Sequence, residues 1–266
     1  NRVSLGVQSF NDAELRFMNR RHNVEEAVAA VKRLQDAGIE NITIDLIFGV
    51  DGFGEDVLRQ SLMQALELQV QHVSAYHLTI EPSTTFHRRL CRGEMREVDE
   101  SRSEAEYALI ESVLCGAGFE HYEVSNYARE GYRSRHNSSY WQSQPYLGIG
   151  PAAHSFDGQN RVWAVSSVAE YLAGVDAGTC YEMEHLIPED RYNETIMTAL
   201  RCREGVDLVA LAENFGRDRM EYFVAESARF VSSGALVNDG NRIAMCPERW
   251  LVSDSVIAEL FVEAQN

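Results

Sequence analysis

The chain has 266 residues, enough to bury a substantial core as one large domain or two. Its 41 acidic and 24 basic side chains give a formal net charge of −17, which argues against a surface that binds nucleic acid or an anionic membrane. No apolar run is long enough to span a bilayer. These values are typical of an acidic globular protein.

Apolar strands and amphipathic helices alternate over the first 82 residues. Helix caps such as Asn23 and a terminating glycine at Gly38 support the helical segments. This alternation predicts right-handed βαβ units in a parallel sheet. The predicted strands are residues 2–7, 41–46 and 72–78, and the predicted helices are residues 11–18, 23–38 and 55–68.

Polar side chains stand at the end of each predicted strand, namely Gln8, Asp45 and Thr79. The carboxyl ends of parallel strands are where α/β folds place ligand groups. We expect these residues and Arg20 on one rim, where an amide and a carboxylate can bind ribose hydroxyls and a guanidinium can hold a carboxylate. Spacing alone favours the simpler interpretation, in which Gln8 and Asp45 cap the following helices and Arg20 is solvated.

The pattern changes after Pro82. The last region, from Pro188, combines three helices with a hairpin turn at Asp239-Gly240, which suggests a small winged-helix-like domain. The acidic balance argues against DNA binding there. The predicted helices are residues 85–92, 99–117, 168–177, 188–201, 207–215, 218–233 and a closing helix from Ser253, and the predicted strands are residues 123–128, 235–237 and 242–245.

His136 is followed closely by two aromatic residues, Tyr140 and Trp141. An imidazole beside aromatic rings is suited to ligate haem iron next to a porphyrin-stacking surface. Composition alone favours a loop histidine ahead of a short aromatic helix that Asn137 or Ser138 caps. His154, in the glycine-rich segment 146–155, is predicted to be a buried histidine that hydrogen-bonds backbone.

Several of these stretches carry a family likeness. In this order they resemble the oxygen-independent coproporphyrinogen III oxidase family of radical SAM proteins, along essentially the whole chain. The pattern His-Asn-x-x-Tyr-Trp points to its HemW-type haem chaperone branch. The stretches are residues 4–10, 19–20, 44–49, 78–82, 122–126, 136–141, 147–156, 191–194 and 200–205.

The resemblance implies an α/β fold with three regions. Residues 1–82 would form the second half of a partial (β/α)6 radical SAM barrel, and residues 83–187 a family-specific region with the haem motif. Residues 188–266 would be the HemN-type C-terminal domain, a small α+β winged-helix-like unit. The first half of the barrel would precede Asn1, so we expect this chain to be the C-terminal part of a longer one.

The resemblance also assigns an S-adenosylmethionine (SAM) site. Gln8 and Asp45 would hold the ribose, and Arg20 would hold the methionine carboxylate. Backbone near Thr79 and Ile149 would flank the adenosine.

A haem site follows from the same resemblance. His136 would be the iron ligand, and Asn137, Tyr140 and Trp141 would complete the motif.

Two departures from the family pattern stand out. The loop CxxxCxxC, which binds the 4Fe-4S cluster in the family, is absent, and the five cysteines present are far apart. Val50-Asp51 replaces the usual Leu-Pro after Gly49, which affects the expected local turn.

The function that the resemblance implies is a cytoplasmic haem chaperone that hands haem to an acceptor protein, with SAM and a 4Fe-4S cluster in the full-length protein. The alternative is an oxygen-independent coproporphyrinogen III oxidase, which decarboxylates two propionates oxidatively in porphyrin biosynthesis. A third is a catalytically dead scaffold. The sequence leaves open the identity of the acceptor, whether the acceptor is membrane-associated, and whether the chain forms a homodimer.

We predict that this 266-residue chain assembles no iron–sulfur cluster, because its cysteines lack the required spacing. Anaerobic reconstitution with iron and sulfide should leave the purified chain without cluster absorbance and without bound sulfide. A stoichiometric cluster would contradict the prediction.

Overall fold

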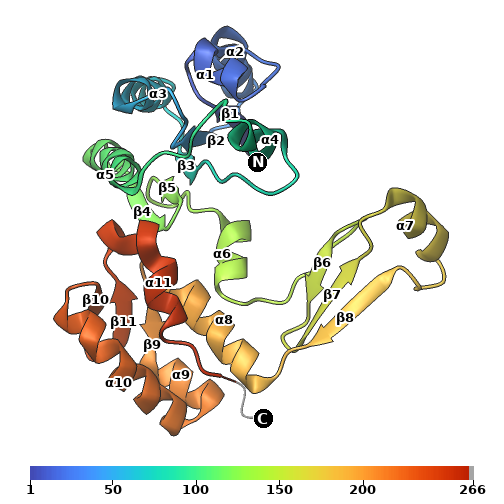
Figure 1. Ribbon diagram of the computed structural model, residues 1–266, viewed down its shortest axis with the longest axis vertical. Helices are drawn as coiled ribbons and strands as arrows, with labels where there is room; N and C mark the ends of the chain where they lie inside the picture. Colours follow the sequence, from blue (N-terminus) through green and yellow to red (C-terminus); the bar gives the residue numbers. More distant parts are fainter. Residues whose placement is uncertain (264–266) are drawn as a thin grey trace. The chain divides into compact units, whose positions relative to one another are not determined.

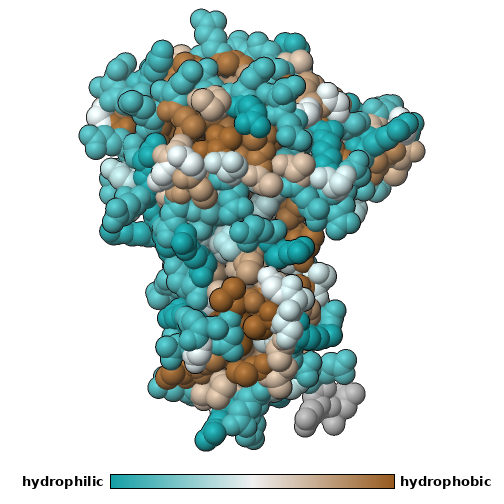
Figure 2. Space-filling model, turned by 90° about the vertical axis from the view of Figure 1, so that its left-hand side faces the viewer, coloured by the Kyte–Doolittle hydropathy of each residue, from teal (hydrophilic) through white to brown (hydrophobic). Residues whose placement is uncertain are grey.

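The computed structural model describes residues 1–263. The chain divides into two compact units, Asn1–Arg133 and Ser134–Asn266 (Figure 1). Hydrophilic side chains dominate the face drawn in Figure 2, as the net charge of −17 suggests. Within the described residues, no helix combines the length and the apolar character needed to cross a membrane. The division into three sequence regions stays a prediction.

The first unit is built on a five-stranded open sheet in the order β1-β2-β3-β5-β4. The three predicted strands are confirmed as parallel neighbours, with β1 joined to β2 and β2 to β3. Two antiparallel strands complete the sheet after β3. The strands are β1 (Arg2–Gln8), β2 (Asn41–Phe48), β3 (His72–His77), β4 (Glu120–Glu123) and β5 (Asn126–Ala128).

Helices connect these strands, and Figure 1 shows α2, α3 and α5 along the same side of them. A complete capping box, made by Asn23 and Glu26, starts α2 as its sequence predicts. Ala27 and Val31 supply the buried stripe of α2. The helices are α1 (Asp12–Phe17), α2 (Val24–Asp36), α3 (Glu55–Glu67), α4 (Thr85–Cys91) and α5 (Glu100–Gly116).

The central strand β2 has two chemically distinct faces. Its apolar face consists of Ile42, Ile44, Leu46 and Phe48, each at most 3% exposed. Because side chains alternate along a strand, Asn41, Thr43, Asp45 and Ile47 point to the opposite, inner face. The apolar face faces the helices, so the inner face is the side free to carry polar groups.

The predicted strand 123–128 is wrong, because the chain turns between β4 and β5. Glu123 is fully buried, and its carboxylate accepts hydrogen bonds from the Ser125 N–H and the Asn126 amide. The Tyr107 hydroxyl donates to the Val124 carbonyl at 2.7 Å. These bonds hold a tight turn where the apolar pattern suggested a continuous strand.

The second unit contains two small sheets and the C-terminal helices. Its first sheet has the antiparallel order β6-β7-β8, and its second has the order β10-β11-β9. The helices and strands are α6 (Arg135–Trp141), β6 (His154–Phe156), β7 (Asn160–Ala164), α7 (Val168–Gly174), β8 (Tyr181–His185), α8 (Pro188–Leu200), β9 (Val206–Asp207), α9 (Leu208–Phe215), α10 (Arg217–Ser232), β10 (Leu236–Asn238), β11 (Arg242–Met245), the 3-10 helix η1 (Pro247–Val252) and α11 (Ser253–Ala258).

The C-terminal part of this unit matches the predicted helices and hairpin. Its core is built from Tyr192, Ile196, Phe223 and Trp250, all at most 1% exposed. The Trp250 indole N–H donates to the Leu200 carbonyl at 3.0 Å, which ties η1 to the end of α8. The short strand β9, which the sequence did not indicate, pairs with β11 and extends the hairpin.

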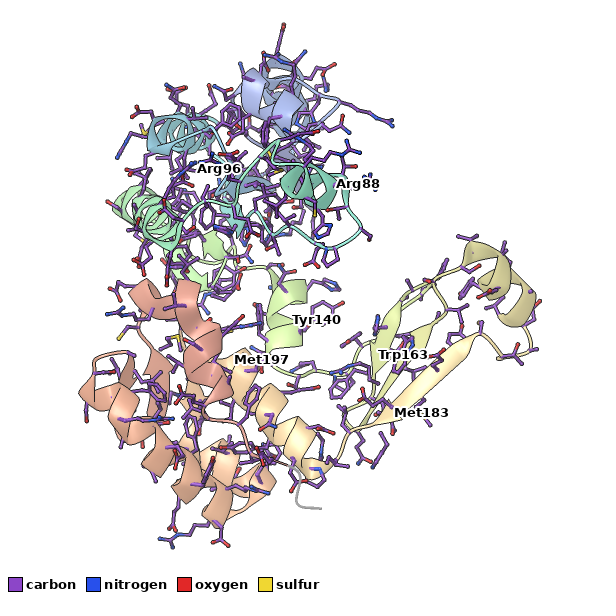
Figure 3. The ribbon with its side chains drawn as sticks, in the orientation of Figure 1. Arg88, Arg96, Tyr140, Trp163, Met183 and Met197 are labelled. Atoms are coloured by element: carbon purple, nitrogen blue, oxygen red, sulfur yellow. The ribbon has the colours of Figure 1, made fainter. Side chains whose placement is uncertain are left out.

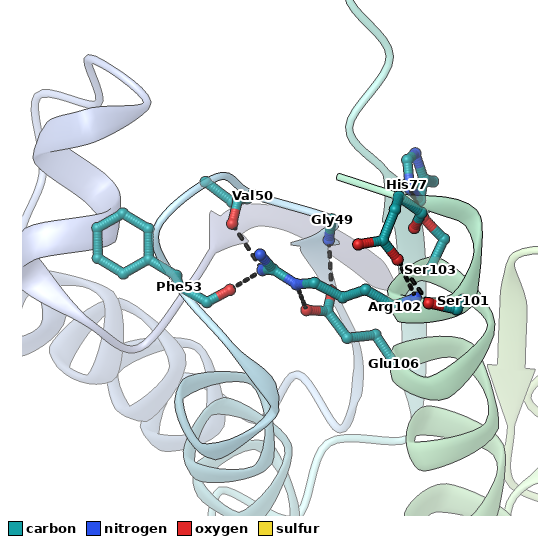
Figure 4. Close-up of polar contacts among 9 residues, drawn as sticks. Gly49, Val50, Phe53, His77, Ser101, Arg102, Ser103 and Glu106 are labelled. Atoms are coloured by element: carbon teal, nitrogen blue, oxygen red, sulfur yellow. Dashed lines mark hydrogen bonds and ion pairs between the residues drawn. The ribbon is translucent and has the colours of Figure 1, made fainter. Parts of the chain in front are cut away.

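An ion pair anchors the loop that follows β2 (Figure 4). Arg102 of α5 donates to Glu106 at 2.7 Å, to the Val50 carbonyl at 2.8 Å and to the Phe53 carbonyl. The other oxygen of the Glu106 carboxylate accepts the Gly49 N–H at 2.7 Å. Because Glu106 is only 1% exposed, its charge depends on Arg102 for compensation.

Removal of this anchor should strongly destabilise the first unit. We expect Arg102→Met to lower the free energy of unfolding by about 3 kcal/mol, since it leaves the buried Glu106 carboxylate unpaired. Urea denaturation at neutral pH measures the change. Arg92→Met is the matched control, because its ion pair with Glu94 is exposed and should contribute less than about 1 kcal/mol. Equal losses in both variants would contradict the role of the buried pair.

Candidate functional site

Polar side chains cover the inner face of the parallel strands. Arg2 donates to the Thr43 hydroxyl at 2.6 Å, to the Asn41 side chain at 3.2 Å and to the Tyr132 carbonyl at 3.0 Å. The Nε2 atom of the buried His72 lies 2.8 Å from the Tyr122 hydroxyl, within hydrogen-bond distance. Such a surface can hold a polar ligand, whereas the opposite face is a hydrophobic core.

Asp45 lies at the centre of this inner face, on β2. The Ser4 hydroxyl of β1 donates to its carboxylate at 3.3 Å, and Ser74 lies directly opposite on β3 and also hydrogen-bonds it. Burial raises the pKa of Asp45, while the bonds from Ser74 and Ser4 and the charge of Arg2 oppose that rise. The two serines therefore orient the carboxylate for a further hydroxyl partner.

Gln8 stands on the neighbouring strand, β1. Its φ is 68°, and a break in the β1–β2 register precedes it. The side-chain amide folds back over Gly6, where an added Cβ would come within 2.6 Å of Gln8 Nε2. A glycine at position 6 thus leaves room for the Gln8 amide on the strand next to Asp45.

Arg20 and Thr79 are the other two predicted residues of the first unit, and each comes after a strand in the sequence. His22 binds the Val7 carbonyl at 3.0 Å, which holds the exposed segment around Arg20 at the carboxyl end of β1. Thr79 is exposed just after β3, where the Leu78 N–H donates to the Phe48 carbonyl at 2.9 Å. Gln8, Arg20 and Thr79 therefore all lie toward the carboxyl ends of the strands.

The alternative roles as helix caps do not hold for Gln8 and Asp45. Asn11 is the N-cap of α1, and Gly54 is the N-cap of α3. Both side chains are thus left for other partners. Ile149 belongs to the second unit and is 86% exposed.

Several inner-face residues were missed by the sequence analysis. Ser74, Tyr76 and Asn126 extend the polar surface from Asp45 towards β5, and Tyr76 hydrogen-bonds both Ser74 and Asn126. Burial raises the pKa of the Tyr76 phenol. Burial also lowers the pKa of His72 to about 3, so this imidazole is neutral at physiological pH. Polar residues at every second position of β1, β2 and β3 were the available signal.

A buried carboxyl group lies beneath the rim. Glu14 is 6% exposed and accepts a 2.5 Å hydrogen bond from Ser9, whose hydroxyl lies 3.4 Å from that of Ser61. Glu14 stands three residues after Asn11, the N-cap of α1, but the Asn11 N–H donates to the Ser9 hydroxyl at 3.0 Å and not to Glu14, so α1 has no capping box. Burial raises the pKa of Glu14 to about 7, and the charge of Glu106 acts in the same direction.

The predicted haem motif forms α6 in the second unit, and Ser134 is its N-cap. His136 lies inside this helix rather than in a loop ahead of it. Its side chain is exposed, and its Nε2 lies 3.2 Å from the Tyr140 hydroxyl. Asn137 and Trp141 are half-buried on the same helix. An imidazole in this position is open to a large planar ligand.

The prediction for His154 is wrong. Its side chain is exposed, and its ring stacks on the Trp163 indole with centroids 6.0 Å apart. The glycine-rich segment approaches backbone of the same chain, since a Cβ at Gly148 would lie 2.1 Å from the His154 carbonyl oxygen. Close packing at Gly148 therefore explains the glycine without a ligand.

Comparison with known proteins matches both ends of the chain to family models. Residues 1–65 match the Radical SAM superfamily, and residues 186–252 match the HemN C-terminal domain. Coproporphyrinogen III oxidase (HemN) from Escherichia coli, a radical SAM enzyme, has a similar structure, with a TM-score of 0.80. That likeness covers 98% of this chain and 64% of the other at 18% identity, so it establishes the fold alone. The fold is that of a radical SAM protein with a HemN-type C-terminal domain, as predicted.

Curated relatives define the family more closely. Heme chaperone HemW from Lactococcus lactis is 33% identical over 267 residues, covering 100% of this chain and 70% of that protein. HemW from Mycobacterium tuberculosis is 34% identical, covering 97% of this chain and 65% of that protein. The chain belongs to the HemW family. It spans about two thirds of the length of these relatives.

The stability of the first unit should depend on the protonation of Glu14. The native state keeps a proton that the unfolded chain releases above about pH 4.5, so this contribution is fully present below pH 4.5 and is lost as the pH rises through about 7. Glu14→Gln, which stays neutral, should gain about 1–3 kcal/mol relative to the original chain between pH 4.5 and 8.

Urea denaturation across this pH range measures the difference. Glu25→Gln, an exposed change on α2, is the matched control and should change the free energy of unfolding by less than about 1 kcal/mol. A Glu14→Gln difference that stays constant with pH would contradict a raised pKa in the native state.

Proposed function

We propose that this protein is a haem chaperone, which binds haem through His136 and passes it to an acceptor protein. The observation that carries the proposal is the exposed His136 imidazole on α6. The HemW relatives, named heme chaperones, support it. The likeness to coproporphyrinogen III oxidase concerns the fold and lends that alternative no separate support.

The surroundings of His136 are suited to reversible binding of haem. The Tyr140 hydroxyl lies 3.2 Å from His136 Nε2, and the two rings are 4.9 Å apart in an edge-to-face arrangement. Iron that binds Nε2 has only this exposed hydrogen bond to displace, at a cost of about 1 kcal/mol. We infer that Asn137 and Trp141, on the same helix, complete the haem-binding surface.

SAM is the cofactor we propose for the inner face of the first unit. Asp45 and Gln8, on neighbouring strands, would bind the ribose hydroxyls, and Arg20 would bind the methionine carboxylate. Backbone near Thr79 would contact adenosine, and the same role for Ile149 stays a prediction of the family resemblance. The serine pair at Asp45 fits this assignment, because it leaves an oriented carboxylate with capacity for another donor. When bound, SAM supplies a 5′-deoxyadenosyl group for radical chemistry.

The cysteines of this chain do not fit a 4Fe-4S cluster. They are widely spaced, and residues 1–263 contain no cluster of three or more His, Cys, Asp or Glu side chains suited to a metal ion. We therefore assign the cluster that the radical SAM family implies to none of the described residues.

We place the protein in the cytoplasm. Its five cysteines are free thiols, which suits a reducing compartment. The acceptor that we propose is a haem-binding protein. The strongly acidic chain favours neither nucleic acid nor an anionic membrane as a partner.

Ferric haem titration up to one equivalent tests the role of His136. The original chain should give a shifted Soret band, and His136→Ala should weaken this binding by more than tenfold, because the axial ligand is lost. His185→Ala, another exposed histidine of the same unit, should bind as tightly as the original chain. Transfer of haem from the loaded chain to apomyoglobin tests delivery. Equal binding by the original chain and His136→Ala would remove His136 from the site.

A further inference from the structure

A strip of aromatic rings connects α6 with β6 in the second unit. Tyr140 contacts Tyr146 with ring centroids 4.7 Å apart, and Tyr146 contacts Phe156 at 6.2 Å. The Tyr146 N–H donates to the Phe156 carbonyl at 2.8 Å, and the Phe156 N–H donates back at 2.9 Å. The strip therefore has a fixed backbone connection, and it begins beside His136.

His154 lies at the other end of this strip. It precedes Phe156 by two residues on β6, so both side chains point to the same face of the sheet. Trp163 pairs with His154 across the strands, and their rings stack with planes 27° apart. Figure 3 labels Tyr140 on α6, where the strip begins, and Trp163 on β7, the strand that pairs with β6.

The His154 imidazole lies beside the Trp163 indole, and its side chain is exposed. The Trp163 indole beside it is fixed by a 3.0 Å hydrogen bond to Glu182 on β8. The Gly148 N–H donates to Ser155 at 2.9 Å and holds segment 147–149 against the strand. Within residues 1–263, the ring nitrogens of His154 make no hydrogen bond.

We propose that His154 is the iron ligand of a second haem-binding site on this protein, separate from His136. The proposal rests on the proposed function, since it assigns a further site for the same cargo. An imidazole bound to iron stands upright on the porphyrin, so an indole nearly parallel to it supports the imidazole rather than stacking on the macrocycle. Ligation replaces a water on ferric iron with the lone pair of one imidazole nitrogen.

The chemistry around His154 favours haem over a free metal ion. A free transition-metal ion needs several protein ligands, and His154 is not part of any group of three or more candidate ligands in the described chain. Haem brings four ligands of its own and needs one imidazole with apolar surface nearby. Phe156 and Tyr146 provide that surface. The rings of Tyr140, Tyr146 and Phe156 lie along the strip between His136 and His154. We therefore expect each histidine to bind a different haem iron.

Haem stoichiometry tests the proposal. With haem in excess, we expect two equivalents of ferric haem on the original chain, the first bound at His136 and the second bound more than tenfold more weakly at His154. We expect one equivalent each on His154→Ala and His136→Ala, measured by difference absorbance and by haem content after gel filtration. The double variant should bind none. His185→Ala should bind two, because His185 occupies the opposite face of the same sheet and its Nδ1 is paired with Asn160.

The contact between the Trp163 indole and the His154 imidazole provides a second test. In the His136→Ala background, Trp163→Ala should lower the affinity for the remaining haem about three- to tenfold, and Trp163→Phe should lower that affinity less. His154 is exposed, so circular dichroism of its alanine variant should match that of the original chain.

Different outcomes separate this proposal from the function it rests on. One equivalent on the original chain, with His154→Ala unchanged, overturns the second site and leaves the chaperone function intact. One equivalent that both single variants lose would place both imidazoles on one iron and equally overturn a separate site. Two equivalents on His136→Ala would instead count against the role of His136.

Discussion

The cost of placing a carboxylate within a buried strand governs the organisation of the first unit. Asp45 sits in β2 among residues whose other face is fully buried against helices. An ionised carboxylate there requires hydrogen-bond donors, and Ser4 and Ser74 supply them from the two flanking strands. The register of β1, β2 and β3 is thereby linked to the chemistry of the inner face. A shift of one residue in β2 would turn Asp45 towards the helices.

The parallel sheet was predictable because the sequence signals that specify its strands and helices are local. Apolar residues at every second position, helix caps at Asn11 and Asn23 and a glycine at the end of α2 all specify structure within a few residues. The general rule for strand ends placed Gln8 and Thr79 at the carboxyl ends of β1 and β3, whereas Asp45 lies within β2, which continues to Phe48. The antiparallel extension by β4 and β5 was not predictable, since it depends on the buried side chain of Glu123 and its bonds to the following turn.

The burial of the histidines is a second property that depends on residues distant in sequence. The sequence indicates that His136, Tyr140 and Trp141 lie close together, but whether an imidazole is buried depends on tertiary packing. His154 was expected in the core because its neighbours are small and apolar, yet those neighbours allow close backbone contact and leave the imidazole outside. By contrast, His72 is fully buried and neutral. Local composition does not distinguish these environments, because each is set by residues distant in sequence.

The anchor of Arg102 on the loop after β2 has a consequence for how freely this chain can vary. Arg102 and Glu106 contact that loop through the carbonyls of Val50 and Phe53 and the N–H of Gly49, which are backbone groups and not side chains. The side chains at positions 50 and 51 make other contacts, since Val50 packs in the core with Leu15 and Met18 and Asp51 accepts a hydrogen bond from the Arg96 N–H at 2.9 Å. A substitution of Arg102 or Glu106 on α5 would therefore disturb a loop that lies far away in the sequence.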